Sequence, residues 1–463
     1  MTDPVPLATG FAPASHEAWE ALVERTLKGA GVESLVTRTA DGLEVQPLYG
    51  ESDGAALPSW RAPLGEHAWD VRTVTWHPDP ARANADVLED LAGGASSVLL
   101  AVWDPAQLPR ALEGVMTDVA PVALDAGFLG PRAADALGEI AKAGPEAPLA
   151  LHMDPISAFA KAGVSPGPIE SHLISAATVA ARLTSTYPKA SLMLASGQVM
   201  HETGGSEAQE LAFMAAAAVA YAKALVRAGL SADAALGGVV LRLAADQDYF
   251  LSIAKLRAAR RIWGRITQAC GVDAPARIEA RSSGRMLAAA DPWTNLVRLT
   301  AAGFAAAVGG ADAIVLGAFT DVLGLPSPLA RRQARNMQLV LMEEAHLGRV
   351  ADPADGAGYL DALTEGLARE GWRRFQAIEA AGGLVEALRS GRIAEDAAAA
   401  RAALAAEVSE GRRKIVGVTD FKPAHTEAVE FEPVSAFPDV SARLPGPDST
   451  CTPLASWRLE EAA

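Results

Sequence analysis

The amino-acid sequence predicts an α/β protein: a β/α (TIM-type) barrel with an extended N-terminal arm and a C-terminal wrapping tail. Half of its 463 residues are hydrophobic, enough to bury a large core. From residue 69 onward, short runs rich in Val, Ile and Leu alternate with helical stretches, which is typical of a parallel sheet covered by helices. Eight such runs over about 250 residues match the size of a β/α barrel. An open, doubly wound sheet is the competing architecture.

The first region, residues 1–60, is predicted to be an arm. Residues 16–29 place four apolar side chains on one helical face, and Gly29 ends the helix: Trp19, Leu22, Val23 and Leu27. Residues 33–49 alternate around an Asp41-Gly42 turn and predict a small hairpin. Because this region has few ways to build its own core, we expect it to contact another surface.

The central region, residues 61–395, carries the eight candidate strands. They are residues 69–76, 96–103, 121–127, 148–153, 191–196, 238–243, 276–280 and 313–317. The first could be an approach strand rather than a stave of the barrel. Residues 206–228 and 248–268 form long apolar-faced helices that suit packing on a sheet.

The last region, residues 396–463, begins with a helix predicted over 396–409. From about residue 423 the composition turns to Pro, Ser, Glu and isolated apolar residues with no sustained period. This composition predicts a linker or wrapping segment rather than a further domain.

Charge and composition exclude several classes of partner. A formal net charge of −16 and a pI near 5.0 disfavour nucleic acid and anionic membrane surfaces, which require surplus Lys and Arg. The apolar runs are shorter than the roughly 20 residues of a membrane span. The N-terminus has no basic, apolar leader, and two distant cysteines, Cys270 and Cys451, do not indicate a disulfide scaffold. We therefore expect a cytoplasmic protein.

Two histidine pairs could carry chemistry because they follow predicted strands. His201-Glu202 could be a general acid/base pair, and His152 with Asp154 lies where barrel active sites concentrate. No further ligands stand at metal-binding spacing. The favoured interpretation of both pairs is structural.

Other polar clusters are also interpreted as structural. Four arginines on one helix could bind phosphate, but such spacing more often gives a solvated or ion-paired face: Arg257, Arg260, Arg261 and Arg265. Of Glu343 and Glu344, one is expected to pair with a buried arginine and the other to face water or a partner. Gly204-Gly205 and Gly309-Gly310 match no phosphate-binding fingerprint and predict turns.

Several motifs in order along the chain resemble the methylmalonyl-CoA mutase family. They are Leu27-Lys28-Gly29, Thr39-Ala40-Asp41-Gly42, Gln46-Pro47-Leu48-Tyr49, Ile253-Ala254-Lys255-Leu256-Arg257-Ala258-Ala259-Arg260 with Trp263, Asp291-Pro292-Trp293-Thr294-Asn295, Arg335-Asn336, Glu343-Glu344, and Asp352-Pro353 with Gly356 and Gly358-Tyr359. Each match is short, but the ordered series covers most of the chain. The resemblance implies a barrel and an N-terminal arm that clasps a partner subunit.

The resemblance also implies a radical rearrangement of methylmalonyl-CoA to succinyl-CoA with adenosylcobalamin. Catalytic members carry Asp-x-His-x-x-Gly, whose histidine ligates cobalt, in a C-terminal domain. The eight histidines here all lack that frame: His16, His67, His77, His152, His172, His201, His346 and His425. We therefore expect no cofactor or metal site in this chain and expect adenosylcobalamin in a partner subunit.

The substrate-handling motifs of catalytic members are replaced. Where those members carry Ser-Gly-Tyr-His-Met, this chain has Gln198 and Val199 in place of Tyr and His. Where they carry a histidine in Ser-Leu-His-Thr-Asn, this chain has Ala318-Phe319. Their Arg-Gln-Tyr-Ala-Gly segment has no match around residues 69–74. The resemblance therefore implies no catalytic residues here.

The implied function is that of the non-catalytic small subunit of a heterodimeric mutase, which stabilises the catalytic large subunit and is inactive alone. The alternative is a barrel-only catalytic subunit that uses a separate cobalamin-binding protein. A third possibility is a regulatory protein that senses acyl-CoA.

Overall fold

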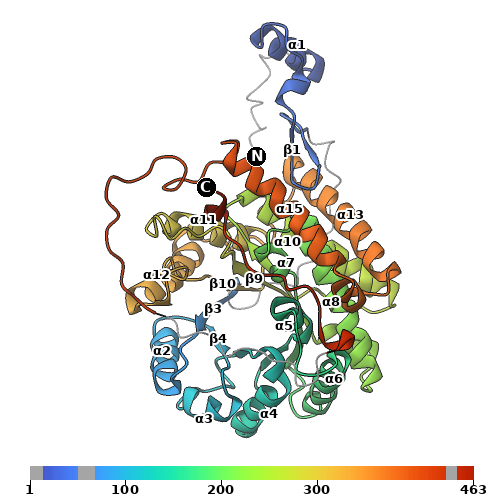
Figure 1. Cartoon of the computed structure of the whole chain (residues 1–463), viewed down its shortest axis with the longest axis vertical. Coiled ribbons are helices and arrows are strands. Elements are labelled where there is room, and N and C mark those ends of the chain that lie inside the picture. The colour runs from blue at the N-terminus through green and yellow to red at the C-terminus, as the bar shows by residue number, and fades with distance from the viewer. Residues whose placement is uncertain (1–13, 51–67, 434–445) are drawn as a thin grey trace, which may run out of the picture.

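Eight parallel strands close into a barrel in a computed structural model that describes residues 14–50, 68–433 and 446–463 (Figure 1). The strands are β3 (Asp70–Thr75), β4 (Ser97–Ala101), β5 (Val122–Asp125), β6 (Ala150–Met153), β7 (Ser191–Ser196), β8 (Val239–Ala245), β9 (Ile278–Ser282) and β10 (Ala313–Val315). β10 pairs in parallel with both β9 and β3, which closes the sheet. The predicted barrel is confirmed and the open sheet is excluded. The first candidate strand, β3, is one of the eight strands of the barrel.

Helices cover the outside of the barrel (Figure 1). They are α2 (Pro80–Ala92), α3 (Leu108–Ala111), α4 (Gly130–Ile140), α5 (Pro155–Ala162), α6 (Ile169–Thr184), α7 (Gln198–Glu202), α8 (Glu207–Arg227), α9 (Ala232–Gly237), α10 (Tyr249–Ala269), α11 (Asn295–Val308), α12 (Pro328–Leu339), α13 (Gly358–Ala380), α14 (Leu384–Arg389) and α15 (Arg392–Ser409). Short 3₁₀ turns cover Val32–Leu35, Pro105–Gln107, Gly127–Leu129, Ala141–Ala143, Pro447–Ser449 and Leu459–Ala462, and a π-helical turn covers Val340–Glu344.

Helix α8 is largely buried and lies between the barrel and α13. Ser206 begins it with a capping box, in which Ser206 and Gln209 satisfy each other's backbone N–H groups. Its alanine-rich sequence allows close packing, and Gly371 of α13 faces Leu211, where a Cβ would lie 3.0 Å from the leucine Cβ. Among the described helices, α8 is long and apolar enough to cross a membrane, but it is mostly buried within the protein.

The inside of the barrel has a polar layer and an apolar layer. On β3, Arg72 and Val74 are alternate residues, so both side chains point inward. Val74 packs with a small apolar cluster separate from the main core: Leu99, Ala123, Ala150 and Val315. Arg72 contacts charged residues of other strands, described below. The main core lies outside the strands, between the barrel and its helices.

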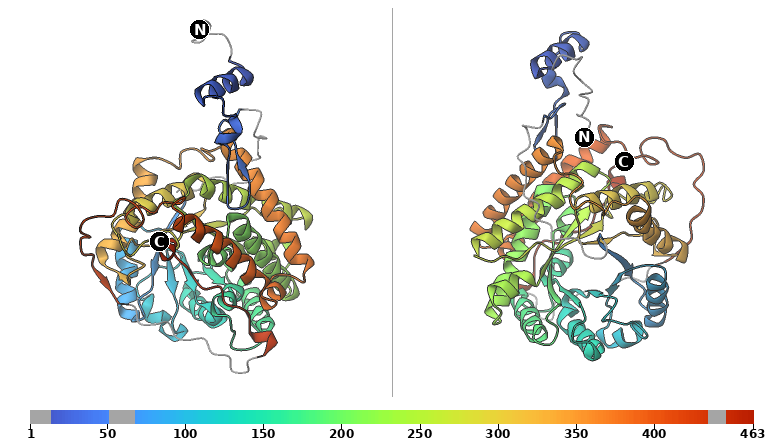
Figure 2. Two further views of the ribbon diagram at one scale, coloured as in Figure 1. Left: turned by 45° about the horizontal axis from the view of Figure 1, so that its top comes forward. Right: turned by 180° about the vertical axis from the view of Figure 1, so that it is seen from behind.

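The arm projects away from the barrel, as Figures 1 and 2 show. Helix α1 (His16–Thr26) begins at Ser15, whose Oγ accepts a hydrogen bond from the N–H of Ala18, and none of its residues is buried. Strands β1 (Thr37–Arg38) and β2 (Glu44–Val45) form the predicted hairpin around Gly42, which has a φ of +76°. The hairpin turn meets the start of α8, where Asp41 accepts a hydrogen bond from the N–H of Ala208.

The C-terminal segment runs back across the barrel (Figure 2). Strands β11 (Leu325–Pro326) and β12 (Phe431–Glu432) pair. The last residues bond to the end of α7, where Trp457 N–H donates to the carbonyl oxygen of Glu202, and to the loop after β9, where Leu459 N–H donates to the carbonyl oxygen of Arg285. A second core joins α15 to this segment: Ala288, Leu404, Val408, Ile415, Val418, Trp457 and Leu459. The predicted boundary near residue 60 lies within residues 51–67, outside the described residues.

Candidate functional site

The first of the two positions predicted to have lost catalytic side chains lies directly after β7. Gln198 begins α7, and its Nε2 donates to Glu202 Oε1 at 3.2 Å. Glu202 Oε1 in turn accepts the N–H of Gly284 at 2.9 Å. Val199 is only 2% exposed and belongs to the main core. This strand end is therefore closed by packing and by a short chain of hydrogen bonds.

The second position lies after β10. Phe319 is 3% exposed and stacks on Trp293 with ring centroids 5.0 Å apart. Its carbonyl oxygen accepts a hydrogen bond from Asn295 Nδ2 at 3.0 Å. Ala318 is also buried, and its N–H donates to Asp321. An apolar ring thus fills the place where the family resemblance locates an imidazole.

An ion-pair network spans the inside of the barrel and centres on Glu279 of β9. Its Oε2 lies 2.5 Å from Arg72 Nη1, and its Oε1 lies 2.5 Å from Arg242 Nε. Arg72 also contacts Asp70 Oδ2 at 2.6 Å. Burial raises the pKa of Glu279, but attraction to Arg242 and Arg72 outweighs burial, so the pKa lies well below its usual range. The network joins β3, β8 and β9 from within.

His152 faces the same network from β6. Its Nδ1 lies 3.8 Å from Glu279 Oε2, and its backbone has a φ of +44° where the register with β7 shifts. Burial lowers the pKa of His152 to about 3, so the imidazole is neutral. Asp154 instead caps α5 through the N–H of Ser157 at 3.0 Å. The structure does not bring His152 and Asp154 together as a pair.

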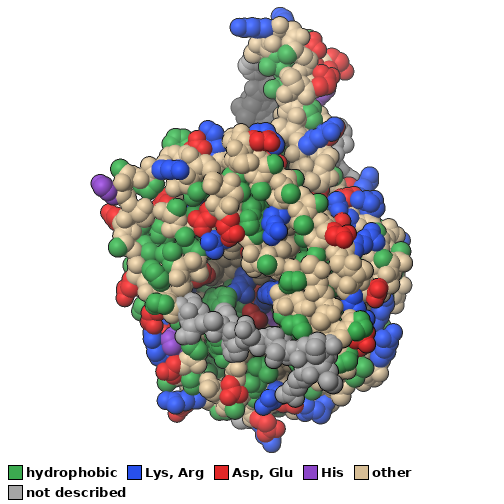
Figure 3. All heavy atoms as spheres, viewed as in Figure 1, with side chains coloured by type: hydrophobic (Ala, Val, Ile, Leu, Met, Phe, Trp, Pro, Cys, Tyr) green, Lys and Arg blue, Asp and Glu red, His purple; other side chains and the backbone are tan. Residues whose placement is uncertain are grey.

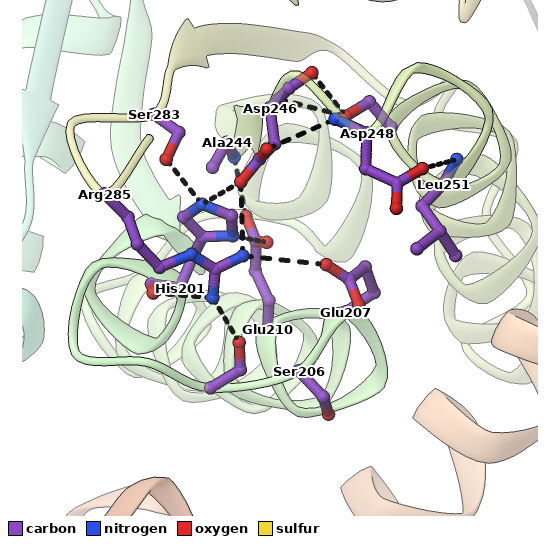
Figure 4. A network of polar contacts seen from close by, with 12 residues as sticks. His201, Ser206, Glu207, Glu210, Ala244, Asp246, Asp248, Leu251, Ser283 and Arg285 are labelled. Carbon is purple, nitrogen blue, oxygen red and sulfur yellow. Dashed lines mark hydrogen bonds and ion pairs between the residues drawn. The ribbon is translucent and has the colours of Figure 1, made fainter. Parts of the chain in front are cut away.

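His201 lies in a second buried network, between α7, α8 and β8 (Figure 4). Its Nδ1 is 3.3 Å from Glu210 Oε2, and its Nε2 is 3.3 Å from Asp246 Oδ2 and 2.7 Å from Ser283 Oγ. Burial and the cations nearby lower the pKa of His201, but hydrogen bonds to Asp246 and Glu210 outweigh them and raise it. Glu202 lies outside this network, so His201-Glu202 is not an acid/base pair.

Cations balance the carboxylates of this network. Lys255 Nζ lies 2.5 Å from Glu210 Oε2, and Arg285 Nη2 lies 3.2 Å from Asp246 Oδ2. Burial raises the pKa of Glu210, yet attraction to Lys255 outweighs it and lowers the pKa to about 2. Figure 4 shows the side chains of Glu210, Asp246 and Arg285 gathered around His201. With its charges paired internally, the network holds α8, α10 and the loop after β9 in place.

A hollow at the barrel mouth is lined by charged side chains (Figure 3). Arg281 at the end of β9 lies over the ring of Trp76, 5.0 Å from its centroid, and 3.6 Å from Asp125 Oδ2. Asp321 accepts the N–H of Ala318 at 3.0 Å. Burial raises the pKa of Asp321 to about 7, although Arg281 acts in the opposite direction.

Replacing Asp321 by asparagine is expected to flatten the dependence of stability on pH. A raised pKa means that Asp321 stabilises the fold fully below about pH 4 and that this contribution is lost as pH rises through 7. At pH 8 the free energy of unfolding of the asparagine variant should therefore exceed that of the wild type by on the order of 2 kcal/mol. Urea unfolding between pH 4 and 8 measures this difference. Asp273→Asn, at an exposed position, is the control. If the free energy of unfolding depends on pH in the same way for the wild type and for Asp321→Asn, the expectation is contradicted.

The helical arginines are occupied within the chain. Arg257 pairs with Asp361 at 2.8 Å, Arg260 with Asp312 at 2.9 Å, Arg261 with Glu365, and Arg265 bonds Gln268. This is the ion-paired face that the sequence favoured over phosphate binding. Gly204 and Gly310 have φ values of +104° and +80°, as the predicted turns require.

The prediction for Glu343 and Glu344 is wrong in one part: neither pairs with a buried arginine, whereas exposure was expected for one of them. Both lie exposed in the π-helical turn, and no ion pair joins either of them to the rest of the described chain. The buried arginine of this region, Arg335, pairs with Asp90 of α2 at 2.7 Å. The widened turn directs both glutamates outward, and α2 supplies the carboxylate instead.

Sequence reasoning singled out His152 and His201 but missed the charged residues that surround them in the two buried networks. Arg72, Arg242 and Glu279 each lie inside a run predicted to be a buried strand. A charge inside such a run is the available signal, because a buried charge needs a partner. The sequence does not indicate which residue is the partner of which, since Arg72 and Glu279 are 207 residues apart.

The described residues do not fit a cobalt site of the kind the resemblance implies. The imidazoles of His152 and His201 are buried in the two networks, and both contact carboxylates. In the described part of the chain, no cluster of His, Cys, Asp and Glu could hold a metal ion.

Fold and site together define a β/α-barrel protein whose strand ends are closed by core packing and internal ion pairs. A family model described as methylmalonyl-CoA mutase matches residues 149–441. The chain is 39% identical to the methylmalonyl-CoA mutase small subunit of Streptomyces virginiae, over 94% of this chain and 75% of that protein. It belongs to the methylmalonyl-CoA mutase family.

Two further relatives are similar to most of this chain. The methylmalonyl-CoA mutase small subunit of Propionibacterium freudenreichii subsp. shermanii is 32% identical over 93% of this chain and 72% of that protein. The methylmalonyl-CoA mutase of Escherichia coli (strain K12) is 28% identical over 90% of this chain and 66% of that protein. The chain thus spans about two thirds to three quarters of the length of these relatives.

Proposed function

We propose that this chain is the non-catalytic small subunit of an adenosylcobalamin-dependent methylmalonyl-CoA mutase and forms a heterodimer with a larger catalytic subunit. The observation that carries the proposal is the filling of the two imidazole positions by Val199 and Phe319, which are 2% and 3% exposed. Two relatives bear the name small subunit, which implies a larger partner. Adenosylcobalamin, bound by the partner, supplies the radical chemistry.

The role of this chain is structural support. Ion pairs around Glu279 and Glu210 hold the barrel strands and their helices in one arrangement, as a rigid subunit surface requires. The arm extends beyond the barrel and presents an apolar helix face that its own barrel does not cover. A partner that binds and buries this face would stabilise the folded state of this chain by mass action.

Cytoplasmic residence belongs to the same proposal. Cys270 and Cys451 are free thiols in the structure, which suits a reducing compartment. The net charge of −16 supports a protein partner rather than nucleic acid.

Co-expression with the larger subunit from the same source tests the function. We expect a one-to-one complex in size-exclusion chromatography, turnover of methylmalonyl-CoA by the complex with adenosylcobalamin, and no turnover by this chain alone. Gln198→Ala should leave turnover of the complex unchanged. A chain that stays monomeric beside the larger subunit would contradict the proposal. Loss of turnover in an intact Gln198→Ala complex would instead favour a catalytic barrel.

A further inference from the structure

Five aromatic side chains form a connected group where the arm joins the barrel. Tyr359 of α13 lies between Tyr49 of the arm and Phe250 of α10, with ring centroids 5.4 Å and 5.3 Å away. Tyr249 lies 4.8 Å from Phe250 and 5.5 Å from Phe304 of α11. We call Tyr49, Tyr249, Phe250, Phe304 and Tyr359 the aromatic patch.

The aromatic patch lies at the surface rather than in the core. Phe250 is 46% exposed, and the other four residues are neither fully buried nor fully exposed. Three of the five tyrosines in the sequence belong to this patch, in a chain that is only 5% aromatic. Single exposed apolar residues are normal, but a connected aromatic group at the surface is typical of a binding site.

The aromatic patch rests on a rigid base. Beneath it lies a small core of its own: Ile253, Ala305, Val308, Ala354 and Leu360, against which Tyr249 and Phe304 pack. Close to the patch, the arm crosses the start of α13 so tightly that a Cβ on Gly358 would lie 2.7 Å from the carbonyl oxygen of Gly50. The rings are therefore held in place before any partner arrives, which reduces the entropy cost of binding.

The aromatic patch is continuous with the arm through Tyr49. Along the arm, Leu48, Leu35 and Leu22 are 43%, 40% and 54% exposed, so apolar surface extends outward from the patch. Figures 1 and 2 show the arm leaving the barrel from this end. A protein held by the arm must therefore approach the end of the barrel that carries the aromatic patch.

We propose that the aromatic patch is the central contact with the barrel of the larger mutase subunit, beside the arm that the family resemblance already places on a partner. This proposal rests on the proposed function. The surface that fits is an apolar face with hydrogen-bonding groups for the tyrosine hydroxyls, since tyrosine combines a large apolar ring with a polar end. Aromatic anchors at the centre of an interface carry most of its binding energy.

The test is the affinity of the full-length chain for the larger subunit, measured by titration. Phe250→Asp is expected to raise the Kd at least about thirtyfold, because it places a charge in the apolar centre of the interface. The new carboxylate lies in the first turn of α10, where helices tolerate acidic residues, so the variant should fold. Ile174→Asp is the matched control: Ile174 is 66% exposed and belongs to α6. Figure 1 shows α6 at the opposite end of the molecule from the arm.

Each outcome has a defined meaning. An unchanged Kd for Phe250→Asp would overturn the inference, and so would a loss of thermal stability of the isolated chain with unchanged affinity. Self-association that Phe250→Asp abolishes, with heterodimer affinity intact, would assign the patch to a second copy and also overturn it. A wild-type chain that does not bind the larger subunit would contradict the proposed function itself.

Hydrogen–deuterium exchange of the wild-type complex gives a second measurement that needs no variant. Amides at the starts of α10 and α13 should exchange more slowly in the complex than in the free chain, whereas those of α6 should not change. Exchange that slows along the arm alone would confine the interface to the arm and overturn the role of the aromatic patch.

Discussion

Replacing Glu279 by glutamine is expected to lower the free energy of unfolding by about 3–5 kcal/mol, because it removes the one charge shared by two buried guanidinium groups. Arg72 and Arg242 both lie 2.5 Å from Glu279, and the side chains of all three are less than 10% exposed. Glutamine keeps the size of the side chain, but its amide nitrogen cannot accept a hydrogen bond, so one of the two guanidinium groups loses its acceptor. Asp70 remains as the carboxylate beside Arg72.

Urea unfolding at neutral pH measures the effect. The matched control is Glu44→Gln, which removes the same charge from an ion pair of similar length, 2.6 Å, whose partner Arg38 is exposed. That change should alter stability by no more than about 1 kcal/mol, since exposed pairs contribute little. If both variants lose equally little stability, the interior of the barrel is better solvated than the structure indicates.

A second variant separates charge from packing. Replacing Glu279, Arg72 and Arg242 together by leucine or methionine should restore much of the stability that Glu279→Gln loses, because buried ion pairs are often replaceable by well-packed apolar residues. Recovery would show that the loss comes from unpaired charge. Failure to recover would show that the polar layer is needed for the barrel to close.

The barrel itself could be predicted from the sequence because each strand carries a local signal. Runs such as 191–196 and 238–243 are mostly apolar, as is typical of strands covered on both sides, although the second contains Arg242. The Asp41-Gly42 turn and the caps at Ser206 and Asp248 are local as well. In all these cases, neighbouring residues determine the structure.

The interior of the site could not be predicted, because its contacts join distant segments. His201 was considered with its neighbour Glu202, whereas its partners are Glu210, Asp246 and Ser283. His201 and Glu202 are the last two residues of α7, and adjacent residues on a helix point in different directions, so adjacency in sequence misled. The replacement of imidazoles by Val199 and Phe319 could be inferred only from the family resemblance. The packing of these two side chains could be seen only in the structure, because their contacts also join distant segments.

Replacing Trp19 by alanine in the arm is expected to weaken binding to the larger subunit about thirtyfold or more, equal to about 2 kcal/mol. Helix α1 has 11 residues and buries none of them against its own barrel. Isolated helices of this length are marginal in water, so α1 requires a surface to pack on. Its apolar face, with Trp19 and Leu22, is what the proposed function places on the partner.

The expected result is a separation of stability from assembly. Because α1 contacts little of the barrel, Trp19→Ala should leave the thermal stability of the isolated chain unchanged while the Kd of the complex rises. Glu24→Ala on the same helix is the control: Glu24 is exposed, and alanine favours the helix. Isothermal titration and thermal unfolding of the three proteins measure both quantities.

The arm is also expected to affect the rate of dissociation of the complex. In the proposed complex the arm encloses the partner, so its loss should mainly speed dissociation, as most interface changes do. Combining Trp19→Ala with Phe250→Asp tests whether the two regions contact the same partner independently, since distant sites add their effects. Additive losses would fit one continuous interface with two anchors. A Trp19→Ala variant that binds as tightly as the wild type, with the arm helix intact, would remove the arm from the interface and leave the barrel surface as the only contact.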